Sequence, residues 1–386
     1  MIAIGRELRD RGFDVVISTS EPYAPLAEAA GLQSVSIIDT QQFHEMLGDP
    51  AVWTPIGGAR RVLRAMVEYF LIPHHNVIRQ YHRPGETVLV SHPLDFASRI
   101  VREADPDTPL VDVHLQPVAL RTPKQPARLT PWWFEVSKPM WGIRLAYWLA
   151  DHFGLDPVIR PAVNRLRAEY QLPPVRRLLN DWWLSPDRIV ALYPEWFAPA
   201  TKEPRVLHAG FPLADIDETT VIPPADQPIV FTAGTAHHHG RRFFQLASDA
   251  CQKLDRPGIL LSTHAENFPI DLPGNVQTHE YLPLKSLLPH CSAIVHHGGI
   301  GTTSQAMAAE IPQVIRPMAF DQFDNATRVE SLGCGIWLKD DAKLEAQLQQ
   351  LTKSATMAAN CKAVRDRLVG TDAVKIATDE IVRQLG

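Results

Sequence analysis

The chain has 386 residues, which at roughly 150 residues per domain predicts two domains or three. Hydrophobic residues make up 45% and charged residues 21% of the sequence, a composition typical of a globular protein with a large core. The 38 Lys and Arg residues against 43 Asp and Glu residues give a formal net charge of −5. This balance gives no indication of a nucleic-acid partner or of an anionic membrane as partner.

The spacing of the cysteines and the length of the apolar runs indicate in which cellular compartment the protein is expected. Cys251, Cys291, Cys334 and Cys361 have no CxxC spacing, which excludes a disulfide framework and a zinc knuckle and favours a reducing compartment. No run approaches the ~18 apolar residues of a membrane span. The first ten residues lack the apolar stretch of a signal peptide. We therefore expect a cytoplasmic protein.

The first elements alternate between helix and strand. Residues 2–10 predict the end of an amphipathic helix, which Gly12 terminates. Residues 13–19 predict a buried strand, 23–30 a helix and 34–38 a second strand. This alternation predicts a parallel sheet with helices on both faces.

In such a sheet the opening helix follows a strand, because the crossover between parallel strands is right-handed. No strand and no N-cap residue precede residues 2–10. We expect the chain to begin inside its first strand–helix unit, without about 10–20 residues of strand, loop and first helical turn. The alternative is a variant that starts with a frayed helix.

Residues 115–200 are rich in proline and in paired aromatic residues, including the Trp132–Phe134 run. They predict a helical insertion in which most aromatic side chains are core. Two alternatives are a pocket for an apolar ligand and weak association with a membrane surface, although no Lys/Arg-rich face supports the latter. Other strands of this half are predicted at 87–90, 110–114, 189–192 and 206–208, with a helix through 96–102.

A second strand–helix series begins after the linker-like residues 215–227. Its predicted strands are 229–232, 258–262, 276–278, 292–296 and 313–316, with a helix near 242–254 and a C-terminal helix from about residue 373. We therefore expect an α/β protein with an N-terminal domain over 1–212 and a C-terminal domain over 213–370. We expect a C-terminal helix over 371–386 that packs back on the N-terminal domain.

The segment from Ile294 to Ser304 runs from a strand into a glycine-rich turn, and we expect a helix to start at about Thr302. Glycines let a backbone approach an anion closely, and helix N-terminal amides and the hydroxyls of Thr302 and Thr303 would face it. His297 adds a donor. The turn lacks the lysine of an ATPase loop. The alternative is a tight turn that binds nothing.

A carboxylate stands beside a carboxamide at Asp321 and Gln322, one strand further along. Together these side chains supply several acceptors and two donors, which suits vicinal sugar hydroxyls. An N-cap in a solvated loop is the alternative. The short distance in sequence from the glycine-rich turn favours the sugar site.

These residues resemble a known family. His297-Gly-Gly-Ile-Gly-Thr-Thr303, with Pro317-Met-Ala-Phe-Asp-Gln322 and Asn325, is similar to the donor signature of nucleotide-sugar-dependent glycosyltransferases. The resemblance is to bacterial macrolide and glycopeptide glycosyltransferases and sterol glucosyltransferases, related to the plant UDP-glycosyltransferases. It covers nearly the whole chain, since residues 5–16 and 23–31 resemble the family's N-terminal domain. It implies the GT-B fold, two Rossmann-like domains in tandem with an interdomain cleft.

The resemblance also implies roles for single residues. His297 and the turn would bind the donor diphosphate, Tyr281 and Leu282 the base, and Asp321 and Gln322 the sugar. Tyr281 stands where the family has Trp, which preserves stacking, and Leu284 stands where it has Gln, which removes a ribose contact. The whole predicted donor site is Gly234, Thr235, Tyr281, Leu282, His297, Gly298, Gly299, Gly301, Thr302, Asp321, Gln322 and Asn325.

The family activates its acceptor with a His or Asp in the loop after the first strand, a loop that would lie upstream of Met1. His92, at a strand end, is our stand-in for this general base, because an imidazole has a suitable pKa. The alternative is a loop histidine that is hydrogen-bonded within the protein.

His237–His239 raise the question of a metal. Adjacent histidines rarely converge on one ion, no acid or Cys completes a tetrahedral set, and the resembling family uses no metal. We expect no metal and no cofactor, and a loop that borders the donor phosphates.

The expected reaction moves a hexose from a UDP- or dTDP-sugar to a hydroxyl of a small lipophilic acceptor, with inversion. Residues 115–200 would supply the acceptor pocket. One rival is a nucleotide-sugar 2-epimerase of the same fold, and another is a protein that binds the donor but is inactive. The sequence does not predict the oligomeric state.

Overall fold

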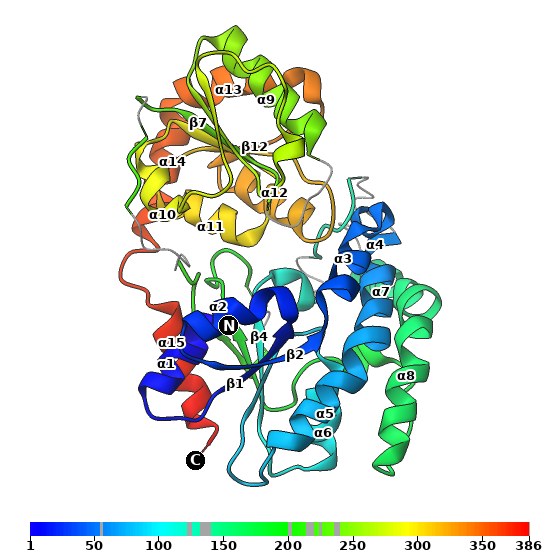
Figure 1. Cartoon of the computed structure of the whole chain (residues 1–386). Helices are drawn as coiled ribbons and strands as arrows, with labels where there is room; N and C mark the ends of the chain where they lie inside the picture. The colour runs from blue at the N-terminus through cyan, green and yellow to red at the C-terminus, as the bar shows by residue number, and fades with distance from the viewer. Residues whose placement is uncertain are drawn as a thin grey trace. The chain divides into compact units, whose positions relative to one another are not determined.

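The computed structural model describes residues 1–54, 57–121, 126–131, 140–199, 203–213, 220–223, 226–234 and 240–385. They form two compact units. The first joins Met1–Ala127, Trp132–Pro212 and Asp372–Gly386, and the second joins Arg128–Pro131 and Leu213–Thr371. Each unit contains parallel strands flanked by helices, so the predicted α/β class is confirmed (Figure 1).

The strands of the first unit pair in parallel in two groups, β1 with β2 and β3-β4-β5-β6 in that order. The strands are β1 (Val16–Ser20), β2 (Gln33–Ile38), β3 (Leu89–Ser91), β4 (Leu110–His114), β5 (Arg188–Ala191) and β6 (Val206–His208). The helices are α1 (Ile2–Asp10), α2 (Ala24–Ala29), α3 (Thr40–Gly48), α4 (Gly57–Ala65), α5 (Leu71–Tyr81), α6 (Phe96–Ala104), α7 (Met140–Leu149), α8 (Asp156–Glu169) and α15 (Ala373–Arg383). Short turns of 3-10 or π helix are η1 (Glu21–Tyr23), η2 (Pro50–Trp53), η3 (Met66–Phe70), η4 (Pro117–Ala119), η5 (Ala150–Leu155) and η6 (Leu178–Trp182).

Strand β4 divides the core of the first unit. All of its residues are buried, as expected for a parallel strand covered on both faces. Because side chains alternate along a strand, Val111 and Val113 face one side and Leu110 the other. The Val111 face packs with α1 and α15, and the Leu110 face packs with α5, α6 and α8.

The last helix, α15, belongs to the first unit and lies beside α1 (Figure 1). Arg11 bonds Asp379 at 2.6 Å, and Arg188 of β5 lies 2.8 Å from Glu380. Ala377 and Ile381 share a buried cluster with Ile4 and Leu8 of α1. The C-terminal residues therefore complete the core on this face of the sheet.

The aromatic residues of the segment 115–200 divide between core and surface. Trp182 is buried, whereas Trp141 and Phe153 are 68% and 67% exposed. The expectation that most of these aromatic side chains are core is therefore wrong for α7 and η5. Apolar side chains lie around most of the circumference of α7, but only the face that packs on the rest of the unit is buried, so the others stay exposed. The residues from Trp132 to Phe134 lie outside the described ranges.

The second unit is one parallel sheet in the order β12-β11-β10-β7-β8-β9. Its strands are β7 (Ile229–Thr232), β8 (Gly258–Leu261), β9 (Val276–His279), β10 (Ala293–His296), β11 (Gln313–Ile315) and β12 (Gly335–Trp337). Its helices are α9 (Arg241–Leu254), α10 (Leu284–Leu287), α11 (Ile300–Ala308), α12 (Gln322–Ser331), α13 (Leu344–Lys353) and α14 (Ala355–Asp366), with short turns η7 (Ala265–Asn267), η8 (Leu288–His290) and η9 (Asp341–Lys343).

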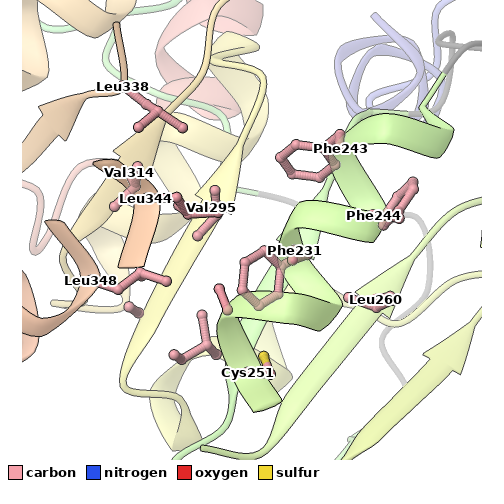
Figure 2. Close-up of a cluster of buried hydrophobic side chains, with 14 of the residues drawn as sticks. Phe231, Phe243, Phe244, Cys251, Leu260, Val295, Val314, Leu338, Leu344 and Leu348 are labelled. Carbon is pink, nitrogen blue, oxygen red and sulfur yellow. The ribbon is translucent and has the colours of Figure 1, made fainter. Parts of the chain in front are cut away.

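Two apolar layers hold this sheet. Phe231 and Val295 project from the strands toward α9 and α13 on one face, where Phe243 and Leu348 meet them (Figure 2). The other face packs against α10 and α11. The four cysteines are all buried and free, so in this part of the molecule they act as apolar side chains.

The strand order reverses between β7 and β10. The chain moves outward from β7 through β8 to β9, then returns to the other side of β7 and continues through β11 to β12. In open parallel sheets, ligands bind at the carboxyl ends of the strands where this reversal occurs. The loops after β7 and after β10 therefore mark the expected binding edge.

Candidate functional site

The turn between β10 and α11 needs glycine for a steric reason. Gly298 has φ +96°, and a Cβ there would lie 2.7 Å from Cγ2 of Ile315. Helix α11 then begins at Ile300, two residues before the predicted start. Its first amides lie at the binding edge of the sheet, where free N–H groups and the positive end of the helix dipole favour an anion.

His297 lies between the two loops that meet at the strand reversal. A Cβ on Gly234, which has φ +85°, would come within 2.6 Å of the imidazole carbon Cε1 of His297. A Cβ on Gly299 would overlap the same ring at Nε2. Both glycines therefore make room for the imidazole. The sequence predicts His297 and these glycines as donor contacts, and the structure adds that the glycines seat the ring.

The neighbouring histidine, His296, fixes the turn from inside the core. Its Nδ1 accepts the N–H of Gly298 at 3.1 Å, and its Nε2 lies 2.9 Å from Oε1 of Gln313. Burial lowers the pKa of His296 to about 3, so the ring is neutral, with its proton on Nε2. Gln313 in turn donates to the carbonyl of Thr303 at 3.3 Å. This support was not predicted from the sequence, in which the polar Gln313 at the start of an apolar run is a signal for it.

The acid–amide pair lies beside the glycine-rich turn, and Asn325 joins the two. Its Nδ2 donates to the carbonyl of Gly298 and to Oδ2 of Asp321, both at 2.9 Å. Asn325 is fully buried on α12, and Asp321 immediately precedes that helix. The structure therefore brings the two predicted motifs together through one side chain.

Asp321 and Gln322 offer different groups to a ligand. Burial raises the pKa of Asp321 to about 6, against the hydrogen bond from Asn325, which lowers it. Oε1 of Gln322 accepts the N–H groups of Met318 and Ala319 at 2.8 and 3.0 Å. The carbonyl oxygen of this amide therefore holds its own loop. Its Nε2 remains the group suited to donate.

Two further predicted residues follow β9. Tyr281 is 46% exposed, and an aromatic side chain at the surface suits stacking. Leu282 packs partly buried against the cluster that α10 and α11 cover, so its side chain anchors this loop. Tyr281 can therefore offer its ring to a base, while Leu282 beside it holds the loop against the core.

The threonines of the turn have separate positions. Thr302 is half-buried in the first turn of α11, next to the exposed Gly301. The hydroxyl of Thr303 instead donates to the carbonyl of Gly299 at 2.9 Å, and the residue is fully buried. The expectation that both hydroxyls face an anion is wrong for Thr303, because its helical position turns it inward.

Two predictions fall outside the described residues, namely Thr235 and the His237–His239 run. Among the residues that the structure does describe, no three His, Cys, Asp or Glu side chains gather as a metal would require. Over the same residues, no helix has the length and apolar character needed to cross a bilayer.

His92 of the first unit follows β3. Its Nδ1 accepts the N–H of Leu94 at 3.2 Å, so the neutral ring carries its proton on Nε2. Burial and the nearby His114 lower the pKa of His92 to about 4. Both features favour a hydrogen-bond donor over a general base, and the predicted role of His92 stays a prediction.

A second histidine of the first unit, which the sequence did not predict, has the arrangement that a base needs. Nδ1 of His74 lies 3.0 Å from Oδ1 of Asp95. Asp95 also accepts the N–H groups of Ala97 and Ser98 as the N-cap of α6. Burial lowers the pKa of His74, but the Asp95 carboxylate raises it, and the net direction is upward. A carboxylate on Nδ1 leaves Nε2 as the basic nitrogen.

The chain is similar in sequence to known glycosyltransferases. Residues 249–385 match the family model described as "Erythromycin biosynthesis protein CIII-like, C-terminal domain". The aclacinomycin-T 2-deoxy-L-fucose transferase of Streptomyces galilaeus is 33% identical over 159 residues, which are 39% of this chain and 36% of that protein. The L-demethylnoviosyl transferase of Streptomyces niveus is 26% identical over 97% of this chain and 90% of its own length.

Solved structures also resemble the chain. The glycotransferase of kitacinnamycin superposes with a TM-score of 0.75 at 20% identity, covering 100% of this chain and 95% of that one. The glycosyltransferase VinC, crystallised in complex with dTDP, gives 0.68 at 18% identity, with 100% and 95% covered. These likenesses confirm the GT-B fold class, and with the sequence matches they confirm the predicted resemblance. Over nearly its whole length the chain is therefore similar to macrolide and antibiotic-type glycosyltransferases, and residues 249–385 carry the match to a family model.

Proposed function

We propose that this protein transfers a hexose from a UDP- or dTDP-sugar to a hydroxyl group of a small lipophilic acceptor, with inversion at the anomeric carbon. The observation that carries the proposal is the link made by Asn325. This residue ties the glycine turn of an anion site to Asp321, the acid of a sugar site. A ligand that has a phosphate and a sugar in one molecule fits this pairing.

The diphosphate would lie against the N-terminus of α11 and the imidazole of His297. As the bond to the sugar breaks, negative charge develops on the leaving diphosphate. Fixed amide donors and the helix dipole at that point lower the energy of the transition state. The positive charge that develops on the sugar resembles that of glycoside hydrolysis.

The sugar would be held by Asp321 and Gln322. An ionised Asp321 accepts hydrogen bonds from sugar hydroxyls, and Nε2 of Gln322 donates to a sugar oxygen. The pKa of Asp321 near 6 means that the carboxylate is mostly ionised at pH 7 and mostly protonated at pH 5. Donor binding by this residue is therefore expected to weaken in acid.

The acceptor and its base belong to the proposal as well. A single base with direct attack gives inversion, and His92 is the predicted base, with His74 as the better arranged candidate. Exposed aromatic side chains on α7 and η5 favour an apolar acceptor. The similarity to a transferase named for aclacinomycin supports the same class of acceptor.

The test combines binding with turnover. Calorimetry measures the affinity for UDP- and dTDP-glucose, and release of the nucleotide diphosphate is followed with and without a polycyclic phenol or a sterol. We expect binding, and release that depends on the acceptor. An epimerised sugar without acceptor would favour the rival epimerase, binding without turnover would favour an inactive donor-binding protein, and no binding to either donor would refute the proposal.

A further inference from the structure

A short stretch from the first half of the sequence belongs to the second unit. Residues Arg128–Pro131 are part of that unit, whereas Met1–Ala127 and Trp132–Pro212 are part of the first. The backbone N–H of Arg128 donates to Oδ1 of Asp324 at 3.0 Å, across 196 positions of sequence. Helix α12 therefore carries an attachment point for Arg128–Pro131, a stretch that we call the brace.

The acceptor of this hydrogen bond is a carboxylate inside the unit. Asp324 is only 3% exposed, and its Oδ2 accepts Nε–H of Arg328 at 2.7 Å. A buried carboxylate is stable only when donors meet its oxygens. Arg328 of the same helix supplies a donor to one oxygen, and the brace supplies a donor to the other. Loss of the brace would therefore leave Oδ1 of a buried carboxylate with one donor fewer, which costs free energy.

The side chain of Arg128 stacks on an aromatic ring. Its Cζ lies 4.0 Å from the ring centroid of Trp337, the last residue of β12. Desolvation at this place lowers the pKa of the guanidinium, whereas the carboxylate of Glu330 opposes that shift. A planar guanidinium is attracted to the face of a tryptophan, and the attraction grows as water is excluded. The guanidinium also donates to the carbonyls of Thr130 and Pro131 at 3.4 and 3.3 Å, so the brace folds around its own side chain.

Trp337 connects this contact to the first turn of α12. Its ring packs against Phe323, with the ring centroids 6.1 Å apart at an interplanar angle of 54°. Phe323 is 2% exposed and directly follows Gln322 in the helix. The brace therefore supports two consecutive residues of this turn, Asp324 by a hydrogen bond and Phe323 through the ring of Trp337.

The other two residues of this turn are held from a different side. Asn325 binds the glycine turn, and the carbonyl oxygen of Gln322 binds the loop that precedes the helix. Phe323 and Asp324 stand between these two residues in sequence. The end of a helix opens locally at little cost in free energy where few contacts oppose the opening. The brace therefore opposes opening at the part of the turn that Asn325 and Gln322 do not hold.

We propose that Arg128 is a positioning residue for sugar binding, which keeps the brace on α12 by stacking on Trp337 and so holds Asp321 and Gln322 in place for the hexose. The inference rests on the proposed function, because it concerns the sugar half of that donor site. The brace contacts α12 and β12, whereas the diphosphate would lie at the turn before α11. Loss of the brace is therefore expected to weaken the binding of the sugar and to leave the binding of the diphosphate unchanged.

The first test separates the sugar from the diphosphate. Calorimetry compares dTDP with dTDP-glucose, or UDP with UDP-glucose if the native protein binds these more tightly. We expect Arg128→Ala to bind the nucleotide diphosphate with native affinity and the nucleotide sugar at least about 5-fold more weakly. Arg128→Lys should recover only part of this loss, because an ammonium group lacks the planar stack.

Lys339→Ala is the matched control for this test. Nζ of Lys339 lies 5.0 Å from the centroid of the same Trp337 ring, but Lys339 is not part of the brace. We expect this variant to keep the native affinity for both ligands. Native affinity for the nucleotide sugar in Arg128→Ala, or an equal loss for the nucleotide diphosphate, would overturn the proposal.

The second test needs no donor. The amide of Asn325 donates to the carbonyl of Asp321 at 2.9 Å and so closes the first turn of α12. Hydrogen exchange followed by NMR should show this amide exchanging at least about 10-fold faster in Arg128→Ala and at the native rate in Lys339→Ala. The amide of Val295, in a strand paired on both sides, should keep its native rate in both variants.

The outcomes of the exchange test decide the inference independently of the transferase activity. An unchanged rate at Asn325 in Arg128→Ala would overturn the proposal. Equal acceleration at Val295 would also overturn it, because the effect would then be a general loss of stability. A native protein that binds neither nucleotide sugar would refute the proposed function, whereas the exchange rate at Asn325 would still decide whether the brace holds this turn.

Discussion

Replacing Asn325 by alanine tests the link between the anion site and the sugar site. The side chain donates from Nδ2 to a backbone carbonyl, that of Gly298, and to a carboxylate, that of Asp321, each at 2.9 Å. Net contributions are about 1 kcal/mol for a bond between neutral groups and about 1.5–3 kcal/mol for a bond to a charged group. The variant removes both bonds and leaves two acceptors in a buried region.

Part of this loss is offset. Oδ1 of Asn325 is buried and has no hydrogen-bond partner within the described residues, so its removal recovers some desolvation free energy. We expect Asn325→Ala to destabilise the glycine turn by about 2 kcal/mol. The pKa of Asp321 should rise further, because the hydrogen bond from Asn325 lowers it in the native protein. Both effects weaken donor binding, because the donor needs an ordered glycine turn and an ionised Asp321.

The assay is calorimetric titration with UDP- or dTDP-glucose at pH 7, whichever binds the native protein more tightly. A loss of about 2 kcal/mol corresponds to a dissociation constant about 30-fold higher. The matched control is Asn360→Ala, because Nδ2 of Asn360 also donates to a glycine carbonyl, that of Gly333, at 3.3 Å beyond the end of α12. We expect the control to keep the native affinity. Native affinity in Asn325→Ala, or an equal loss in both variants, would refute the linking role of Asn325.

Three further predictions concern single side chains. Because burial raises the pKa of Asp321 to about 6, donor affinity should fall as the pH is lowered from 7 to 5, and calorimetry of Asp321→Asn should show weaker binding without this pH dependence. His297→Ala should lower kcat by about 100-fold through loss of a donor to the leaving diphosphate, whereas His290→Ala, an exposed histidine of the same unit, should keep native kcat in a nucleotide-release assay. For the base, kcat of His74→Gln should fall by at least about 100-fold, whereas His92→Gln should retain most of the activity.

Each of these predictions has an outcome that contradicts it. A pH profile of binding that is the same in the native protein and in Asp321→Asn would remove the carboxylate from sugar binding. A His297 variant with the kcat of the His290 control would remove the imidazole from leaving-group stabilisation. Full turnover in the His74 variant with loss in the His92 variant would instead establish the base that the sequence predicts.

The sequence predicted the strand and the tight turn of the candidate site because the signals there are local. An apolar run that ends in glycines predicts a buried strand and a tight turn, and Gly298 indeed has a positive φ. Helix α11 starts at Ile300 and not near Thr302, because glycine and isoleucine give no N-cap signal that marks the first turn. The turn was thus predictable, but its helix boundary was not.

Hydrogen-bond partners could not be predicted, because they depend on which strands become neighbours. His296 meets Gln313 only because β10 and β11 pair in parallel. The carbonyl oxygen of Gln322 accepts hydrogen bonds from the backbone of its own loop, so this oxygen is not the group that the amide offers to a sugar. The pairing of His74 with Asp95 joins residues 21 positions apart in sequence. Tertiary contacts therefore decided which predicted groups remain available to a ligand.

A crystal structure of the protein with dTDP-glucose or UDP-glucose shows directly where the donor binds. We expect the diphosphate at the first amides of α11, next to His297, and the hexose hydroxyls at Asp321 and Gln322. A donor bound at another edge of the second unit, or a side chain of the protein filling the place of the diphosphate, would contradict it.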